Sequence, residues 1–172
     1  GAVLIGQRGN TPIVARSTFA DSPGTFIADV PDEFPLVGIP ILGGVDLLRV
    51  PAGTHWAVSQ EDLFDRFAAV RMQDARDDAL VIAVSPAWRD EVERAVRSDG
   101  LGISQVVSQV GLVSLIGTPE FIARDFPTAG AIADKLGVPV SFAEQTDIRA
   151  TFAVPDSEAA RLASAFYDAF AA

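Results

Sequence analysis

Hydrophobic and polar residues alternate with two different periods along this chain, which predicts a mixed α+β protein. Runs rich in β-branched and aromatic residues predict strands, and apolar residues three or four positions apart predict helices. The predicted strands are Thr11–Phe19, Thr25–Ile27, Leu36–Leu42, Val45–Val50, Val70–Gln73, Leu80–Val84, Val106–Val110, Leu112–Ile116, Val138–Ala143 and Ile148–Val154. The predicted helices are Gln60–Val70, Trp88–Arg97, Phe126–Leu136 and Ser157–Ala169.

The order of these elements repeats. A β-α-β-β-α-β series ends at Val110, and a second begins after Gly111 at a period of roughly 65 residues. The second series ends before its fourth strand, which Leu36–Leu42 is available to supply. Two prolines and three acids in Asp29–Pro35 predict an extended linker. We therefore expect an α+β fold of two ferredoxin-like βαββαβ units, with antiparallel sheets that carry helices on one face. The expected parts are residues 1–35, residues 44–110, and residues 36–43 together with 111–172.

Composition removes several classes of function. The chain has 13 Lys plus Arg against 23 Asp plus Glu, and the resulting net charge of −10 disfavours nucleic acid and anionic membrane surfaces as partners. It has no Cys, which excludes disulfides, thiolate zinc sites and cysteine nucleophiles. Its apolar stretches are shorter than the roughly 20 residues that cross a bilayer, and the first residues do not fit a signal peptide. We expect a cytoplasmic protein that needs no cofactor.

Few residues suggest chemistry of their own. His55 is the single histidine, so a metal site or a histidine-based triad would lack its other members. The cluster of Asp74, Asp77 and Asp78 with Arg71 and Arg76 fits a solvated hairpin tip better than a cation site. The phenylalanines fall on apolar faces, which predicts core packing. No paired carboxylates, nucleophile motif or metal spacing supports an enzyme in its own right.

Three segments carry a resemblance to one family. Residues 11–27, TPIVARSTFADSPGTFI, are similar to the segment that closes the catalytic domain of aspartokinases, where a strand of the type IPVRVRSTF precedes a P-G-T-L-I turn. Residues 112–117, LVSLIG, are similar to the family's KVSLIG strand, and residues 138–154 align without gaps to its VNIELISTSEIRISVLV pattern. The chain thus resembles the C-terminal regulatory region of aspartokinases: tandem ACT domains, preceded by the last strand and turn of the amino-acid kinase domain.

The resemblance implies a feedback module that binds an amino acid, commonly lysine or threonine. Family members hold the effector at the loop after the first strand of an ACT unit and on its second strand. By position, the effector-binding residues are Pro51, Ala52, Gly53, Thr54, His55, Met72, Gln73, Asp74, Gln145, Thr146 and Asp147, with residues 117–126 as the corresponding loop of the second unit. A loop leading into a helix offers unpaired N–H groups to the effector carboxylate, and an acid such as Asp74 can hold its ammonium.

The resemblance also implies partners and a lack of catalysis. A homodimer is expected, as is a kinase domain or subunit that the module regulates. The K-F-G-G-T strand-loop that cradles ATP phosphates does not occur, so this chain is not expected to phosphorylate aspartate, although its parent protein would be an aspartate kinase of lysine biosynthesis. The family's D-x-P-G loop corresponds to residues 49–53, RVPAG, which lack the acid. This departure motivates the alternative hypothesis of a structural dimerisation module with degenerate effector pockets.

Overall fold

The structure is a computed structural model that describes residues 13–15, 25–27, 35–51, 66–77 and 79–171. The chain divides into two units, residues 1–34 and 35–172. In the first unit, strands β1 (Ile13–Ala15) and β2 (Thr25–Ile27) pair antiparallel, with Ile13 opposite Ile27. The two strands predicted in this unit are confirmed over these residues, whereas the predicted linker 29–35 lies outside them except for Pro35.

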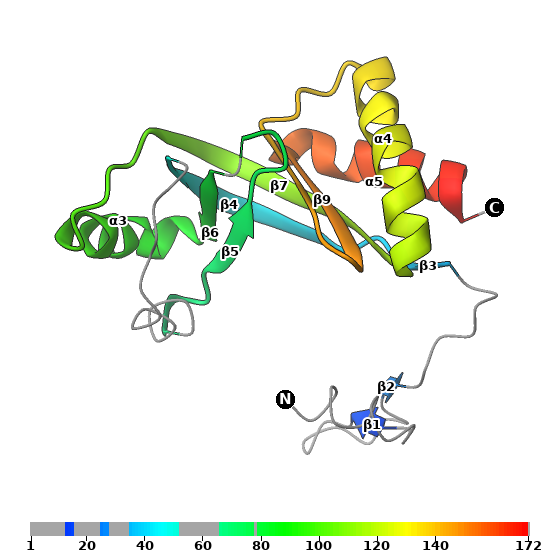
Figure 1. The fold of residues 1–172 in the computed structure, drawn as a ribbon, viewed down its shortest axis with the longest axis horizontal. Helices are drawn as coiled ribbons and strands as arrows, with labels where there is room; N and C mark the ends of the chain where they lie inside the picture. The colour runs from blue at the N-terminus through cyan, green and yellow to red at the C-terminus, as the bar shows by residue number, and fades with distance from the viewer. Residues whose placement is uncertain (1–12, 16–24, 28–34, 52–65, 78, 172) are drawn as a thin grey trace. The chain divides into compact units, whose positions relative to one another are not determined.

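One antiparallel sheet organises the second unit (Figure 1). Its strands lie in the order β5-β6-β4-β7-β9-β8, and β3 pairs with the end of β7. The strands are β3 (Leu36–Gly38), β4 (Ile41–Val50), β5 (Val70–Gln73), β6 (Leu80–Val84), β7 (Gln105–Gly117), β8 (Phe142–Gln145) and β9 (Arg149–Pro155). The α-helices that the structure describes are α3 (Arg89–Ser98), α4 (Pro119–Leu136) and α5 (Asp156–Phe170), and a short 3-10 helix, η2 (Pro86–Trp88), precedes α3.

Strands β4 and β7 join what the sequence predicted as two sheets. Strand β4 is a single strand across the predicted break before Val45, and β7 is a single strand across Gly111. The two strands pair from Ile41 opposite Val113 to Arg49 opposite Gln105. The prediction of separate sheets is therefore wrong, because each of these strands is long enough to serve both repeats.

Within this shared sheet each repeat keeps the ferredoxin-like strand order. The first repeat lies as β7-β4-β6-β5 and the second as β4-β7-β9-β8, so both central strands are used twice. Register shifts between β4 and β7 allow the double use, and they lie next to Gly44 and Gln109, which both have positive φ angles of 67° and 57°. The left-handed conformation suits Gly44, which has no Cβ. The predicted α+β class with antiparallel strands is confirmed.

The described residues form three hydrophobic cores, two of which lie between the sheet and its helices. In the first repeat, Val92 and Val96 of α3 pack with Leu48 and Ile82. In the second, α4 and α5 cover strands β7 and β9 (Figure 1). Leu162 and Phe166 of α5 are among the fully buried side chains. Because alternate strand residues face opposite sides, these helix-facing positions all belong to one face of the sheet. The prediction of helices on one face is confirmed for the helices described.

The third core lies on the other face of the sheet. Leu47, next to the helix-facing Leu48, packs there with Met72 of β5, Phe142 of β8 and Ala153 of β9. Since β5 and β8 are the two ends of the strand order, their shared core requires the sheet to bend until its ends meet. Two backbone segments distant in sequence are thereby brought together.

Several element boundaries differ from the predictions. Helix α4 begins at Pro119 instead of Phe126, because Thr118 caps it by accepting a hydrogen bond from the Phe121 N–H at 3.3 Å and proline suits the first helical position. Strand β8 begins at Phe142 instead of Val138. Val138 directly follows Gly137, the residue with a φ of 68° that caps the end of α4, so the chain is still leaving the helix there. The predicted helix 60–70 lies outside the described residues as far as 65, and Val70 belongs to β5.

Candidate functional site

The first predicted effector segment, Pro51–His55, is described only at its first residue. Pro51 is exposed and directly follows β4. Ala52, Gly53, Thr54 and His55 lie outside the described residues. The part of this site that the structure does describe is therefore on β5.

The predicted residues at the end of β5 and directly after it have three different environments. Met72 is 3% exposed and belongs to the core shared by the sheet ends. Gln73 has an exposed side chain, but its backbone N–H donates to Oε1 of Glu144 at 3.1 Å. Asp74 is completely buried. Alternation along the strand explains why Met72 cannot face a solvent-filled site while its neighbour Gln73 does.

Asp74 lies at the centre of an arginine cluster. One oxygen, Oδ1, accepts from Nε of Arg76 at 2.9 Å and from the Arg76 backbone N–H at 3.1 Å, while Oδ2 accepts from Nη2 of Arg76 at 2.7 Å and Nη1 of Arg49 at 2.6 Å. Arg49 also pairs with Asp77. The prediction of a solvated hairpin tip is thus wrong at Asp74, because two guanidinium groups compensate its charge inside the fold.

These contacts fix the charge of Asp74. Burial raises the pKa of its carboxyl, but the hydrogen bonds from Arg76 and Arg49 outweigh burial and lower the pKa from 3.8 to about 2. The same hydrogen bonds raise the pKa of Arg49 and of Arg76. The carboxylate is therefore ionised at neutral pH and is already satisfied by groups of its own chain.

The second predicted segment, Gln145–Asp147, ends β8 and turns toward β9. All three side chains are exposed. The turn is held by Thr146, whose N–H and Oγ1 reach the carbonyl oxygen of Arg149 at 2.8 and 3.2 Å. The carbonyl of Ile148 accepts from the N–H of Gly117 at 3.1 Å, so this turn lies against the start of α4. Residues 117–126 are mostly helical, and the prediction of a loop there is wrong beyond Thr118.

The structure brings the first predicted segment against strand β8, which leads into the second, through what we call the β5–β8 bridge. The bridge comprises the contacts of Gln73, Ala75 and Arg76 with Ser141, Ala143 and Glu144, together with Asp74 and the two arginines that hold it. The N–H of Ala75 donates to the carbonyl of Ala143 at 2.8 Å, and Nη2 of Arg76 donates to the carbonyl of Ser141 at 2.6 Å. The third contact is the bond from Gln73 to Glu144. Segments some 70 residues apart thus become neighbours.

Glu144 extends the bridge to β9. Its side chain is 7% exposed, and Oε2 accepts from Nη2 of Arg149 at 2.6 Å. Arg149 is also the residue whose carbonyl holds Thr146 in the predicted effector turn. Sequence reasoning missed Arg49, Glu144 and Arg149 as site residues. The sequence does contain a sign that Glu144 is buried: it lies two positions after Phe142 on a predicted strand, so the acid and a core residue share one face. A buried acid needs a charged or hydrogen-bonding partner.

An open groove of about 750 Å³ lies beside the bridge, lined by the β7 segment 107–110, residues 139–141 and the start of α5. Two of its polar side chains, Asp156 and Ser141, have partners within the chain. Oδ1 of Asp156 accepts from the N–H of Gly44 at 2.9 Å, and Oγ of Ser141 donates to the carbonyl of Ala153 at 3.2 Å. The β5–β8 bridge, which contains predicted site residues, remains the better candidate for a functional site.

The second unit is thus a bent antiparallel sheet in which two ferredoxin-like repeats share their central strands, with the described helices on one face. No family model matches the sequence. The chain is 27% identical to an aspartokinase of Mycolicibacterium smegmatis, over 95% of this chain and 44% of that protein. It therefore spans less than half the length of the curated relative that it matches.

Solved structures show the same fold. E. coli aspartokinase III, in complex with lysine and aspartate in its T state, superposes with a TM-score of 0.64 at 12% identity, covering 97% of this chain and 40% of that chain. The ligand-free regulatory subunit of aspartate kinase from Thermus thermophilus superposes with a TM-score of 0.58 at 12% identity, covering 79% of this chain and 98% of the subunit. The predicted resemblance to the regulatory region of aspartokinases is confirmed.

None of the helices in the described part of the chain is long and apolar enough to cross a bilayer.

Proposed function

We propose that this chain is the amino-acid-binding regulatory module of an aspartokinase or an aspartokinase-like protein, and that it has no catalytic site of its own. The observation that carries the proposal is the match to the T. thermophilus regulatory subunit, because nearly all of a chain that is itself a regulatory subunit is covered. The likeness to an aspartokinase over 95% of this sequence supports the same assignment.

The proposed module has two ACT units and an N-terminal extension. The first unit comprises residues 44–110, the second comprises residues 36–43 and 111–172, and residues 1–35 are a strand-turn segment with a linker. Pairing of Ile41 and Leu42 with Val113 and Leu112 supports the assignment of residues 36–43 to the second unit. A cytoplasmic location, a homodimer and contact with a kinase domain or subunit belong to the same proposal.

The effector site that we propose combines backbone N–H groups of residues 52–55 with the exposed parts of β5 and of the 145–147 turn, since Pro51 has no N–H to donate. The effector carboxylate would accept from the N–H groups, as anions do at helix N-termini. Asp74 can hold the ammonium only if Arg49 or Arg76 leaves it, because its oxygens already accept four hydrogen bonds. Gln73 and Asp147 have exposed side chains and need no such displacement.

Titration calorimetry with each of the twenty amino acids tests the proposal. Lysine or threonine is expected to bind, and E. coli aspartokinase III with its lysine is the structural precedent. Charge-assisted hydrogen bonds contribute about 1.5 to 3 kcal/mol, so Asp74→Ala should weaken binding roughly 10- to 150-fold if Asp74 holds the ammonium. Unchanged affinity in Asp74→Ala would remove this residue from the site, and Asp147→Ala then tests the turn. An absence of heat with all twenty would refute effector binding.

A structural dimerisation module is the second candidate function. The observation that favours it is a group of exposed apolar side chains on β3 and β4: Val37 at 55%, Ile41 at 45% and Leu42 at 48% exposure. Such side chains gain free energy when a second surface covers them. Sedimentation velocity distinguishes the outcomes, because a dimer without amino-acid binding supports this function, and an 18.1 kDa monomer at high micromolar concentration contradicts it.

A further inference from the structure

The β5–β8 bridge joins the predicted effector residues Gln73 and Asp74 to strand β8, which leads directly into the second predicted segment, residues 145–147. Arg49 holds Asp74, and Gln73, the chain neighbour of Asp74, donates its N–H to Glu144. Glu144 in turn pairs with Arg149, whose carbonyl holds Thr146. These polar contacts all lie within 3.2 Å, and the peptide bond between Gln73 and Asp74 links the two groups of contacts. From this geometry we infer that the bridge couples the two segments, so that a change at one alters the stability of the other. The inference rests on the proposed function for the ligand, whereas the coupling itself is a property of this chain.

Because its carboxylates are buried, we expect the bridge to change between discrete arrangements when an arginine is lost. Asp74 is fully buried and Glu144 is 6% exposed, so neither carboxylate can exchange its arginine for water without a large loss of solvation. Loss of Arg149 leaves the Glu144 carboxylate buried beside the N–H of Gln73, and Glu144 must then move. Interfaces of this kind adopt discrete arrangements and do not deform continuously. A ligand that draws Arg149 toward the 145–147 turn would therefore disturb Gln73 and the adjoining Asp74 cluster.

Apart from the apolar core that Met72 and Phe142 share, the described part of the sheet offers no hydrogen-bonded connection between β5 and β8 as short as the bridge. Between β5 and β8 the ladder passes through β6, β4, β7 and β9, all of whose backbone pairing is internal to the core. Those strands are held by many residues, whereas the bridge depends on three contacts, two of which involve a charged side chain. Local opening is expected where few contacts hold two segments together.

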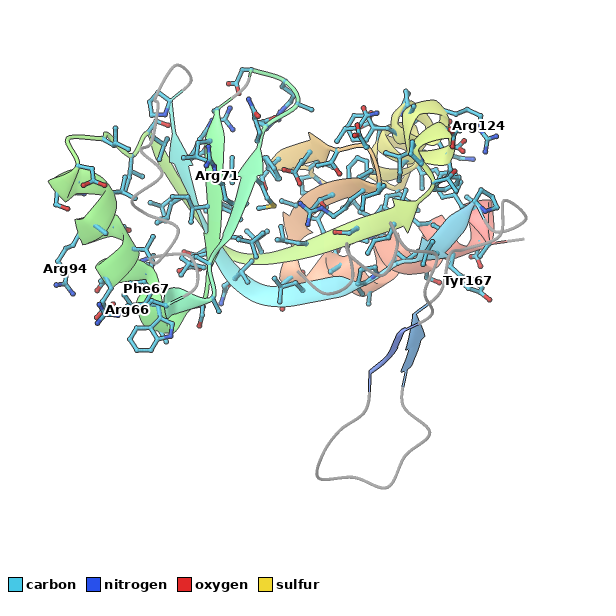
Figure 2. The ribbon with its side chains drawn as sticks, turned by 60° about the horizontal axis from the view of Figure 1, so that its bottom comes forward. Arg66, Phe67, Arg71, Arg94, Arg124 and Tyr167 are labelled. Atoms are coloured by element: carbon cyan, nitrogen blue, oxygen red, sulfur yellow. The ribbon has the colours of Figure 1, made fainter. Side chains whose placement is uncertain are left out.

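Amide hydrogen exchange of the whole chain by NMR tests the coupling. Arg149→Met removes the charge that holds Glu144 and keeps most of the side-chain stem. Exchange at the Gln73 and Ala75 amides should become about tenfold faster, since one hydrogen bond to a charged group is lost. Arg124→Met is the matched control: Arg124 projects from α4 and pairs with its neighbour Asp125, and its loss changes the net charge equally (Figure 2). The control should change the rates at Gln73 and Ala75 less than about twofold.

A variant on the β5 side of the bridge and a double variant test the coupling further. Arg49→Met should speed exchange at the Thr146 amide, which is on the other side of the bridge. If the segments are coupled, the double variant of Arg49 and Arg149 will speed exchange at Ala75 no more than the larger single effect; if they are independent, the two fold-changes will multiply. Multiplying effects, or unchanged rates at Gln73 and Ala75 in Arg149→Met, would overturn the inference.

Two further measurements distinguish a loss of coupling from unfolding and from a failure of the proposed function. If β7 and β9 amides lose protection in Arg149→Met, the variant is unfolded, and Glu144→Gln, which keeps the side-chain shape, replaces it with the same expected rates. Chemical-shift titration with lysine and with threonine then examines the ligand. Shifts in both segments support the proposed function and the coupling, and shifts confined to one segment support the function but contradict the coupling. No shifts with either amino acid contradict the choice of effector, and the variants alone decide the coupling.

Discussion

The core beneath α4 and α5 and the β5–β8 bridge hold the same sheet by opposite means. The core buries thirteen side chains, none of them polar, and includes stacked and tilted contacts of Phe152 with Phe126 and Phe166. The bridge joins the sheet ends through backbone groups, two buried acids and arginines that are partly exposed. Apolar packing is insensitive to charge and to small ligands, whereas a charged bridge responds to both. The apolar core therefore provides stability, whereas the charged bridge is the part that can respond to a ligand or to pH.

The largest effect is expected in the apolar core. Phe166→Ala removes a completely buried ring that contacts Phe152 and Phe170 and should lower the free energy of unfolding by about 3 to 5 kcal/mol. Tyr167→Ala, at the next position and 64% exposed, is the control and should change it by less than about 0.5 kcal/mol (Figure 2). Urea denaturation measures both. Equal effects at the two positions would show that this core does not hold the sheet.

The next effect concerns the charged centre of the bridge. Asp74→Ala leaves Arg49 and Arg76 without their buried partner and should cost about 3 kcal/mol, the lower end for breaking a buried ion pair. Asp77→Ala removes an acid whose side chain is 56% exposed and should cost no more than about 1 kcal/mol. Chemical denaturation of both variants gives the difference. A cost for Asp74→Ala as small as that for Asp77→Ala would mean that the bridge contributes little to stability.

Acid should weaken the bridge selectively. The pKa of Asp74 falls from 3.8 to about 2 on folding, so its ionised form stabilises the fold above pH 4 and this contribution is lost as the pH falls toward 2. The difference corresponds to about 2 kcal/mol. The unfolding free energy of the natural chain should therefore decrease more than that of Asp74→Asn between pH 4 and pH 2. Parallel pH dependences would contradict the assignment of the low pKa to Asp74.

The smallest effect tests a structural residue outside both regions. Thr118→Ala removes the side-chain cap of α4 and should cost about 1 kcal/mol, whereas Thr118→Ser keeps the hydroxyl and should cost less. Thermal unfolding followed by circular dichroism compares the two variants. A similar cost for both would show that the capping hydrogen bond is unimportant and that the rest of the side chain matters.

Local patterns in the sequence determined most of the elements. Short β-rich runs predicted β5 and the wholly apolar β6, and apolar spacing predicted α3 and α5 to within one residue at each end. These elements are predictable because each local pattern reflects which of its faces must be buried, both faces in the case of β6. The order of elements also led to two ferredoxin-like repeats. Residues 11–27, 112–117 and 138–154 carry the resemblance to aspartokinases, and the similarity to known aspartokinases confirms it.

Tertiary structure alone decided how the repeats combine. The sequence pattern of residues 105–117 fits one continuous strand as well as two strands separated by Gly111. Which of the two forms depends on whether β4 pairs with it along its whole length. The same holds for the bridge. Asp74 looked like a residue of a solvated turn, since a local pattern contains no information on the bend of the sheet that places it against Arg49 and brings Gln73 to Glu144. Burial of a charge depends on partners from other strands, and these contacts exist only once the chain has folded.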